Sequence, residues 1–271
     1  MGYENVNLAF LLTLIAGLST GIGGLVVIFM KGTNKKFLSV SLGFSAGVMI
    51  YISFIEILQE ARVYLISSFG SYKGELITII SFFAGMAFVA LIDKLIPEFG
   101  GHPFLGEKCE SPNPNAIKSN TSRKLFRTGA LTAIAVTIHN FPEGIATFIS
   151  SIKDPSLGIA LTIAIAIHNI PEGISISVPI YCATGNKSKA FLISLLSGLT
   201  EPLGAILGYF ILMPFLNDAV FGITFAAIAG IMVFISFHEL LPSSKEYGEE
   251  HLSLYGLIGG MAIMAVSLVV I

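Results

Sequence analysis

The sequence is poor in charge, has little cysteine and contains no tryptophan. Only 12% of its 271 residues are charged, about half the share found in soluble domains, whereas 54% are hydrophobic. This balance excludes an ordinary soluble protein and predicts an integral membrane protein that contacts the lipid bilayer. The formal net charge of -2 also argues against a nucleic-acid partner. Without tryptophan, tyrosine has to supply any aromatic belt at the membrane surface.

Several motifs are absent as well. The two cysteines, Cys109 and Cys182, are not spaced as a Cys-x-x-Cys pair and match no thiolate metal site. The chain has no GxxxxGK[ST] motif, so a P-loop ATPase is excluded and no resident cofactor is expected. The first residues lack the basic stretch of a secretory signal peptide, so we expect the first apolar run to remain as a membrane span.

Eight apolar runs are long enough to cross a bilayer, at about 20 residues each. They are expected near residues 7–29, 38–58, 74–95, 127–149, 156–181, 189–213, 218–241 and 252–271. The connections between them are short, except for a polar loop at 97–126 that contains prolines and is expected to be mobile. The sequence therefore predicts an all-α integral membrane protein that forms a single transmembrane domain over residues 1–271.

The basic residues predict how the chain is oriented. Most of the 15 lysines and arginines fall at connections on one side of the predicted spans, and that side should be cytoplasmic. Both termini then lie outside a plasma membrane, and the loop at 97–126 lies inside. Cys109 and Cys182 would also be on the cytoplasmic side, where free thiols are the usual state.

An internal repeat links the second and seventh runs. The segment AGVMIYISFIE at 46–56 and the segment AGIMVFISFHE at 229–239 are identical at most positions. The two runs cross the membrane in opposite directions, and so do the fourth and fifth runs. Inverted repeats of this kind are typical of secondary transporters with a binding site near the membrane midplane.

A six-residue pattern, His-Asn-apolar-Pro-Glu-Gly, occurs twice, beginning at His139 and at His168. The His and the Glu of each copy are four residues apart and therefore share one face of a helix. Imidazole and carboxylate groups are costly inside hydrocarbon, so their presence indicates a functional site. Glu201 lies at a similar depth in the next run, about 18 Å from the membrane face.

This coincidence predicts a metal-binding site. The candidate ligands are His139, Asn140, Glu143, His168, Asn169, Glu172 and Glu201. Nitrogen and oxygen ligands without thiolate suit Zn²⁺, Fe²⁺, Mn²⁺, Co²⁺ or Cd²⁺ and do not select among them. The set exceeds what one tetrahedral zinc needs, which leaves room for two adjacent metal positions bridged by Glu143 and Glu172.

Other interpretations of the same residues stay open. Polar residues on membrane helices can simply bond neighbouring helices. Chains of His and Glu also carry protons through pumps, so a proton relay is an alternative. An intramembrane metalloenzyme is another alternative, although the chain has no His-Glu-x-x-His motif. The sequence does not separate a carrier from a channel.

Two acids occupy equivalent places in the repeat, Glu56 toward the predicted outer face and Glu239 toward the cytoplasmic face. Together with His238 they are candidate entrance and exit groups for a metal ion. The alternative is that they lie at span ends, where water or a lysine neutralises them. Asp93, Lys94 and Glu98, at the end of the third run, are expected to form an interfacial charge cluster.

The doubled motif, the acid at Glu201 before Pro202, the eight runs and the long loop at 97–126 together resemble the ZIP family of zinc and iron transporters, and most closely its prokaryotic zinc-uptake members. The resemblance covers essentially the whole chain. It implies a bundle in which spans one to three are related by inversion to spans six to eight, with spans four and five at the centre. It also implies a binuclear metal site and a homodimer in some members. The loop is poor in histidine, holding only His102, and departs in this from many relatives.

The resemblance also distributes the ligands. By motif match, the first metal position takes His139, Glu143, His168 and Glu172, and the second takes Asn140, Glu143, Asn169, Glu172 and Glu201. The expected function is that of a non-enzymatic carrier that moves divalent metal, zinc before the others, into the cytoplasm by alternating access. A divalent cation moving inward gains about 4.6 kcal/mol per 100 mV of membrane potential, so no ATP is needed.

Overall fold

The computed structural model describes residues 5–29, 35–95, 120–247 and 250–270, and within these ranges every regular element is a helix. The predicted all-α class is confirmed. The described helices are α1 (Val6–Phe29), α2 (Lys35–Ile52), the π-helical turn η2 (Ser53–Ile57), α3 (Leu58–Phe69), α4 (Ser71–Leu95), α5 (Asn120–Lys153), α6 (Pro155–Thr184), α7 (Lys187–Gly198), α8 (Thr200–Leu207), the π-helical turn η4 (Gly208–Leu212), the short 3-10 turn η5 (Met213–Phe215), α9 (Asp218–Ile235), the π-helical turn η6 (Ser236–Leu240), α10 (Leu241–Tyr247) and α11 (Glu250–Val270).

Several of these helices continue directly into one another and form long runs, such as α2–η2–α3 and α9–η6–α10. In the described residues, seven runs are long and apolar enough to cross a membrane. The remaining long helix, α5, carries the first His-Asn-apolar-Pro-Glu-Gly copy, whose polar residues interrupt its apolar stretch. The fold is that of a multi-pass membrane protein.

Two expectations from the sequence need correction. Residues 120–126, assigned to the long loop, form the first turns of α5. The apolar pattern missed them because a helix keeps its backbone hydrogen bonds after it leaves the hydrocarbon, where its residues become polar. The remainder of that loop, 97–119, lies outside the described residues. Cys182 in α6 is disulfide-bonded rather than a free thiol, and Cys109 also lies outside the described residues.

Tight connections fix α5, α6 and α7 as antiparallel neighbours. Asp154 caps α6, and its carboxylate accepts from the backbone N–H of Ser156 at 2.8 Å, with Pro155 as the first helical residue. At the other end, Gly185 has a φ of 65°, a left-handed conformation that glycine adopts at low cost. Asn186 then caps α7. Because each connection is so short, the two motif-bearing helices must lie side by side.

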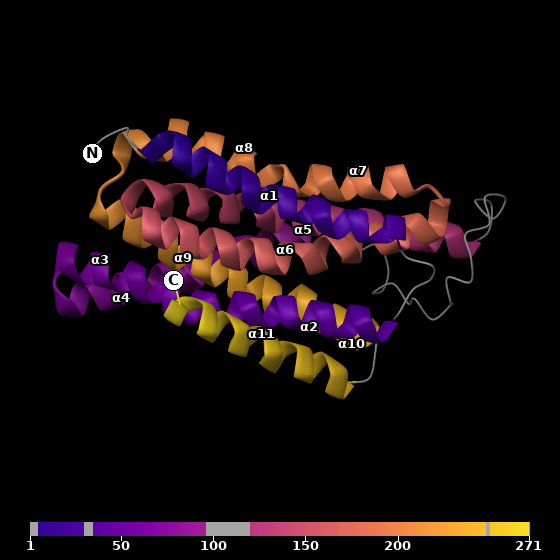
Figure 1. Ribbon diagram of the computed structural model, residues 1–271. Coiled ribbons are helices and arrows are strands. Elements are labelled where there is room, and N and C mark those ends of the chain that lie inside the picture. Colours follow the sequence, from indigo (N-terminus) through magenta and orange to yellow (C-terminus); the bar gives the residue numbers. More distant parts are fainter. Residues whose placement is uncertain (1–4, 30–34, 96–119, 248–249, 271) are drawn as a thin grey trace.

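The helices form two layers (Figure 1). One layer contains α1, α5, α6, α7 and α8, in which α1 packs on α6 and α7 while α5 packs on α6 and α8. In the other layer, α2 packs on α11 and α4 packs on α9. Contacts of α2 with α6 and of α5 with α9 join the layers. The apolar windows of α4 and α11 are only 28% and 22% buried, so these helices have wide apolar faces for lipid.

The sequence repeat also appears as a structural repeat. Both copies end in a π-helical turn, η2 in the first and η6 in the second. In the first, the Ser53 hydroxyl donates to the Met49 carbonyl at 2.6 Å, and in the second, Ser236 donates to Met232 at 2.8 Å. The same sequence thus gives the same local backbone in α2 and in α9, two helices of the layer that packs against the motif-bearing pair.

Candidate metal centre

The predicted ligands lie on α5, α6 and α8 in the interior of the protein. None of them is more than 1% exposed; they are His139, Asn140, Glu143, His168, Asn169, Glu172 and Glu201. Both motif prolines, Pro142 and Pro171, lie inside continuous helices. The glycine that ends each motif allows a close helix crossing, since a Cβ on Gly144 would collide with the carbonyl oxygen of Glu201. The structure thus brings all the predicted ligands into one region.

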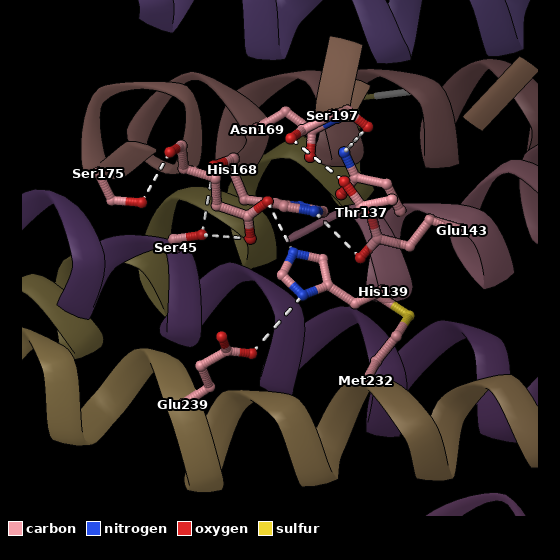
Figure 2. Close-up of polar contacts among 12 residues, drawn as sticks. Ser45, Thr137, His139, Glu143, His168, Asn169, Ser175, Ser197, Met232 and Glu239 are labelled. Carbon is pink, nitrogen blue, oxygen red and sulfur yellow. Dashed lines mark hydrogen bonds and ion pairs between the residues drawn. The ribbon is translucent and has the colours of Figure 1, made fainter. Parts of the chain in front are cut away.

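The two motifs pair crosswise. His139 of the first motif places Nε2 3.1 Å from Oε2 of Glu172 in the second. His168 of the second places Nε2 3.3 Å from Oε1 of Glu143 in the first. Figure 2 shows His168 and Glu143 facing each other between the helices. Each imidazole is therefore matched to a carboxylate from the other helix, not to the one four residues along its own.

The protonation of His168 follows from its second nitrogen. Nδ1 lies 3.1 Å from the carbonyl oxygen of Ala164, one turn earlier. A carbonyl only accepts hydrogen bonds, so Nδ1 carries a proton, and in the neutral ring Nε2 would present a lone pair to Glu143. Two acceptors 3.3 Å apart need a cation between them. A proton or a metal ion satisfies both, and a backbone-anchored Nδ1–H is the usual arrangement for a metal-binding histidine.

His139 lies between two carboxylates. Its Nε2 faces Glu172, while Nδ1 lies 3.9 Å from Oε2 of Glu239 on η6 (Figure 2). If Nε2 binds a metal ion, a proton on Nδ1 can point toward Glu239 and hold the ring in place. The Glu239 side chain is 32% exposed, unlike Glu172 at 0%.

The asparagines extend the site toward Glu201. The Asn169 side-chain amide donates both to Glu201 and to the Ala16 carbonyl, the latter at 3.1 Å. The Asn140 amide donates to the Ser197 carbonyl at 3.3 Å. The NH₂ group of each asparagine therefore donates to a neighbour, whereas the amide oxygens of Asn140 and Asn169 have no hydrogen-bond partner within the described residues. Oxygens left in this way are suited to a hard cation.

Most of the buried side-chain atoms that lack a hydrogen bond in the described part of the chain belong to this site. They are Nδ1 of His139, Oδ1 of Asn140, both carboxylate oxygens of Glu143, Nε2 of His168, Oδ1 of Asn169 and Oε2 of Glu201. Such atoms are costly in a membrane interior. The site also holds more carboxylates than imidazoles, so the chemistry of this set calls for added positive charge.

In the described ranges, no three His, Cys, Asp or Glu side chains gather closely enough to hold one ion between them. The imidazoles and carboxylates are engaged with one another in pairs instead. Capture of a divalent ion by these residues therefore requires the pairs to separate by side-chain rotation. Each pair already contains one nitrogen and one oxygen ligand, so a modest rearrangement exchanges a His–Glu contact for two metal–ligand bonds.

The candidate entrance and exit groups lie in two different environments. Glu239 lies within the helical run α9–η6–α10, well before its end at Tyr247, and reaches His139. Its neighbour His238 lies 3.7 Å from Asp93 at the end of α4, with side chains 54% and 46% exposed. Glu56, on η2, is half-buried and in the described structure forms no ion pair with the two motifs.

Two residues beside the site were not predicted as part of it. The Ser45 hydroxyl lies 3.2 Å from the His168 carbonyl and 3.4 Å from Oε1 of Glu172, and so joins α2 to the second motif. Met232 points its sulfur toward His139 in Figure 2. The sequence contained a signal for both, because Met232 lies in the second repeat segment and Ser45 directly precedes the first.

Comparison with known proteins adds to this geometry. A family model described as "ZIP Zinc transporter" matches residues 106–268, more than half of the chain. The "Zinc transporter ZupT" of Clostridium perfringens is 56% identical over 274 residues, which cover 98% of this chain and 96% of the relative. Those of Lysinibacillus sphaericus and Chlorobium chlorochromatii are 57% and 51% identical over 268 and 267 residues, with 98% of both chains covered in each case. The resemblance drawn from the doubled motif is confirmed.

Proposed function

The chain belongs to the ZIP family of zinc transporters, and from that premise we propose that it carries zinc across the plasma membrane into the cytoplasm. Iron, manganese, cobalt and cadmium are candidate further substrates, because the nitrogen and oxygen ligands do not exclude them. The relatives are named as zinc transporters, which does not favour the metalloenzyme and proton-relay alternatives.

The crossed pairs of the two motifs are the observation that supports this proposal most directly. Two imidazoles and two carboxylates, none more than 1% exposed, stand in contact across the centre of a membrane protein. They are the ligands of the proposed first metal position. The second position is assigned to the unpartnered oxygens of Asn140, Asn169 and Glu201, together with the two glutamates of the motifs. Because Glu143 and Glu172 are ligands of both proposed positions, they would keep the two ions close together and let one displace the other.

Glu239 and His238 are proposed as the exit route toward the cytoplasm. Side-chain exposure rises in steps from 1% at His139 to 32% at Glu239 and 54% at His238. Each step offers a carboxylate or an imidazole to an ion leaving the first position. Glu56, in the equivalent place of the other repeat, is proposed as the entrance group, with both termini outside the cell.

Transport is proposed to occur by alternating access. The layer that carries both motifs meets α2 and α9 through two polar contacts of the site, Ser45 with the His168 carbonyl and His139 with Glu239. A movement of α5 and α6 relative to α2 and α9 would break these contacts and present the site to the other face. The membrane potential supplies about 4.6 kcal/mol per 100 mV for an inward divalent ion.

Zinc uptake into proteoliposomes tests the proposal. The unmodified chain should accumulate zinc, and Glu143→Ala and Glu172→Ala should abolish uptake. Glu75→Ala is the matched control, since Glu75 pairs with Arg62 on the exposed surface and not with either motif. Repeating the assay with Fe²⁺, Mn²⁺, Co²⁺ and Cd²⁺ ranks the metals.

Saturable uptake with a slow turnover would favour a carrier over a channel. If correctly folded, unmodified protein takes up no divalent metal at all, the transport proposal is wrong. If the two motif variants transport zinc as well as Glu75→Ala does, transport takes place but the assigned site is wrong.

A further inference from the structure

Thr20 on α1 has a buried hydroxyl that no residue of the described structure satisfies. Its side chain is 0% exposed, and Oγ1 has no hydrogen-bond partner within the described ranges. Three other buried threonines donate to the carbonyl one turn earlier, as Thr13 does to Ala9 at 2.8 Å and Thr162 does to Gly158 at 2.7 Å, whereas Thr147 on α5 lacks a partner as Thr20 does. An unsatisfied hydroxyl is costly inside a membrane protein, so the Thr20 hydroxyl calls for an explanation.

The two asparagines of the motifs show where Thr20 belongs in the inverted repeat. The Asn140 amide donates to the carbonyl of Ser197, before α8, and the Asn169 amide donates to the carbonyl of Ala16, in α1. Ser197 and Ala16 are therefore equivalent positions. Counting four residues on from each leads to Glu201 in one half and to Thr20 in the other.

The glycine contacts give the same correspondence independently. A Cβ on Gly144 would collide with the carbonyl oxygen of Glu201, and a Cβ on Gly173 would collide with that of Thr20. Since Gly144 and Gly173 are the last residues of the two motif copies, α8 crosses α5 as α1 crosses α6. Thr20 therefore occupies, at the crossing of α1 with α6, the position that Glu201 occupies at the crossing of α8 with α5.

The local geometry is consistent with this placement. A Cβ built on Gly198 would lie 3.0 Å from Oγ1 of Thr20. Gly198 directly follows Ser197, the residue whose carbonyl Asn140 contacts. The Thr20 hydroxyl therefore lies beside the segment whose carbonyl accepts from Asn140. This matches the other half, where Glu201 lies beside Asn169 and accepts from its amide.

We infer that Thr20 is a further metal-binding residue, whose hydroxyl oxygen completes the second zinc position opposite Glu201. This inference rests on the proposed function. A hydroxyl supplies an oxygen ligand without charge, whereas a glutamate would add another buried carboxylate to a site that already has several. The repeat thus places one anionic and one neutral oxygen at equivalent positions, which limits the charge that a single divalent ion has to balance.

Zinc titration of the purified full chain by isothermal calorimetry tests this inference. Thr20→Val and Thr20→Ala both remove the hydroxyl, one keeping and one reducing the side-chain volume. Each should weaken one zinc-binding event by about three- to tenfold, the range for one neutral polar contact. Thr20→Ser keeps the hydroxyl and should restore most of the affinity. Thr13→Val is the control, because Thr13 lies on the same helix and already has its hydrogen bond.

Three results would overturn the inference. The first is a zinc dissociation constant for Thr20→Val and Thr20→Ala within about twofold of that for Thr13→Val, because substitutions at positions without a role vary by about that much. The second is a Thr20→Ser affinity as weak as that of Thr20→Val, since packing and not the hydroxyl would then be responsible. The third is an unmodified chain that neither binds nor carries zinc, which would refute the proposed function and this inference together. In the first two cases, loss of zinc uptake in Glu143→Ala would leave the proposed function intact.

Discussion

Glu172 offers the sharpest test of the crossed pairs. Its carboxylate lies 3.1 Å from Nε2 of His139 and 3.4 Å from the Ser45 hydroxyl, and its side chain is 0% exposed. Glu172→Gln keeps the shape of the side chain and removes its charge. With zinc bound, the variant lacks one anionic ligand, and without zinc it leaves His139 beside a neutral amide.

The size of the effect follows from the kind of contact that is lost. A hydrogen bond to a charged group contributes about 1.5–3 kcal/mol when both partners are buried. At about 1.4 kcal/mol per tenfold change, Glu172→Gln should weaken zinc binding about ten- to hundredfold. Calorimetric titration of the purified chain in detergent micelles measures the dissociation constant, and the same preparation in proteoliposomes measures uptake.

Glu75→Gln is the matched control for this experiment. Glu75 bonds Arg62, but the two side chains are 37% and 48% exposed, and exposed pairs contribute little. The control should bind zinc as the unmodified chain does. If Glu172→Gln also binds zinc within about twofold of the unmodified chain, Glu172 is not a ligand and the crossed pairs are only structural contacts.

Two further predictions concern the proton and the helix crossings. Zinc affinity should fall as the pH is lowered from about 7.5 to about 5.5, because protons compete with the metal for His139, His168 and the carboxylates. An affinity that stays constant over this interval would contradict a zinc site that contains imidazole ligands. Gly173→Ala should lower the thermal unfolding midpoint in detergent, because its Cβ meets the Thr20 carbonyl and overpacking costs about 1–3 kcal/mol. Gly259→Ala is its control, since a Cβ there meets nothing within 4 Å, and equal midpoints for the two variants would contradict the close crossing of α1 and α6.

The helical fold was predictable because the membrane imposes a simple rule. Only a helix or a closed barrel satisfies the backbone in hydrocarbon, and each long apolar run here became a helix. The ends of the helices were not predictable in the same way. The run expected to stop at 58 continues through η2 to Phe69, and α5 starts at Asn120 within the expected loop. Hydropathy marks where the hydrocarbon ends, whereas backbone hydrogen bonding continues beyond it.

The members of the candidate site were predictable, but their partners were not. Spacing along one helix suggested that His139 and Glu143 would act together, whereas the structure pairs each of them with the other motif. The pairing depends on the register between α5 and α6, which the short turn at Asp154 fixes, and sequence periodicity on a single helix carries no information about that register. The position of Glu239 beside His139 depends in addition on η6, since a π-helical turn rotates the residues that follow it.

The two inverted halves match in their backbone contacts and differ in their chemistry. Asparagine amides reach a carbonyl in each half, and the last glycine of each motif meets a carbonyl oxygen in each half. The side chains at equivalent positions are nevertheless unlike, with Thr20 against Glu201 and Ile55 against His238. The backbone contacts set the packing of the bundle and are needed twice. The proposed ligands are not needed twice, because each proposed metal position draws one set of side chains from both halves. The extra acid and the extra imidazole both fall in the half formed by spans six and seven. An ion in the site therefore meets different chemistry on its two sides, even though the helices around it are arranged alike.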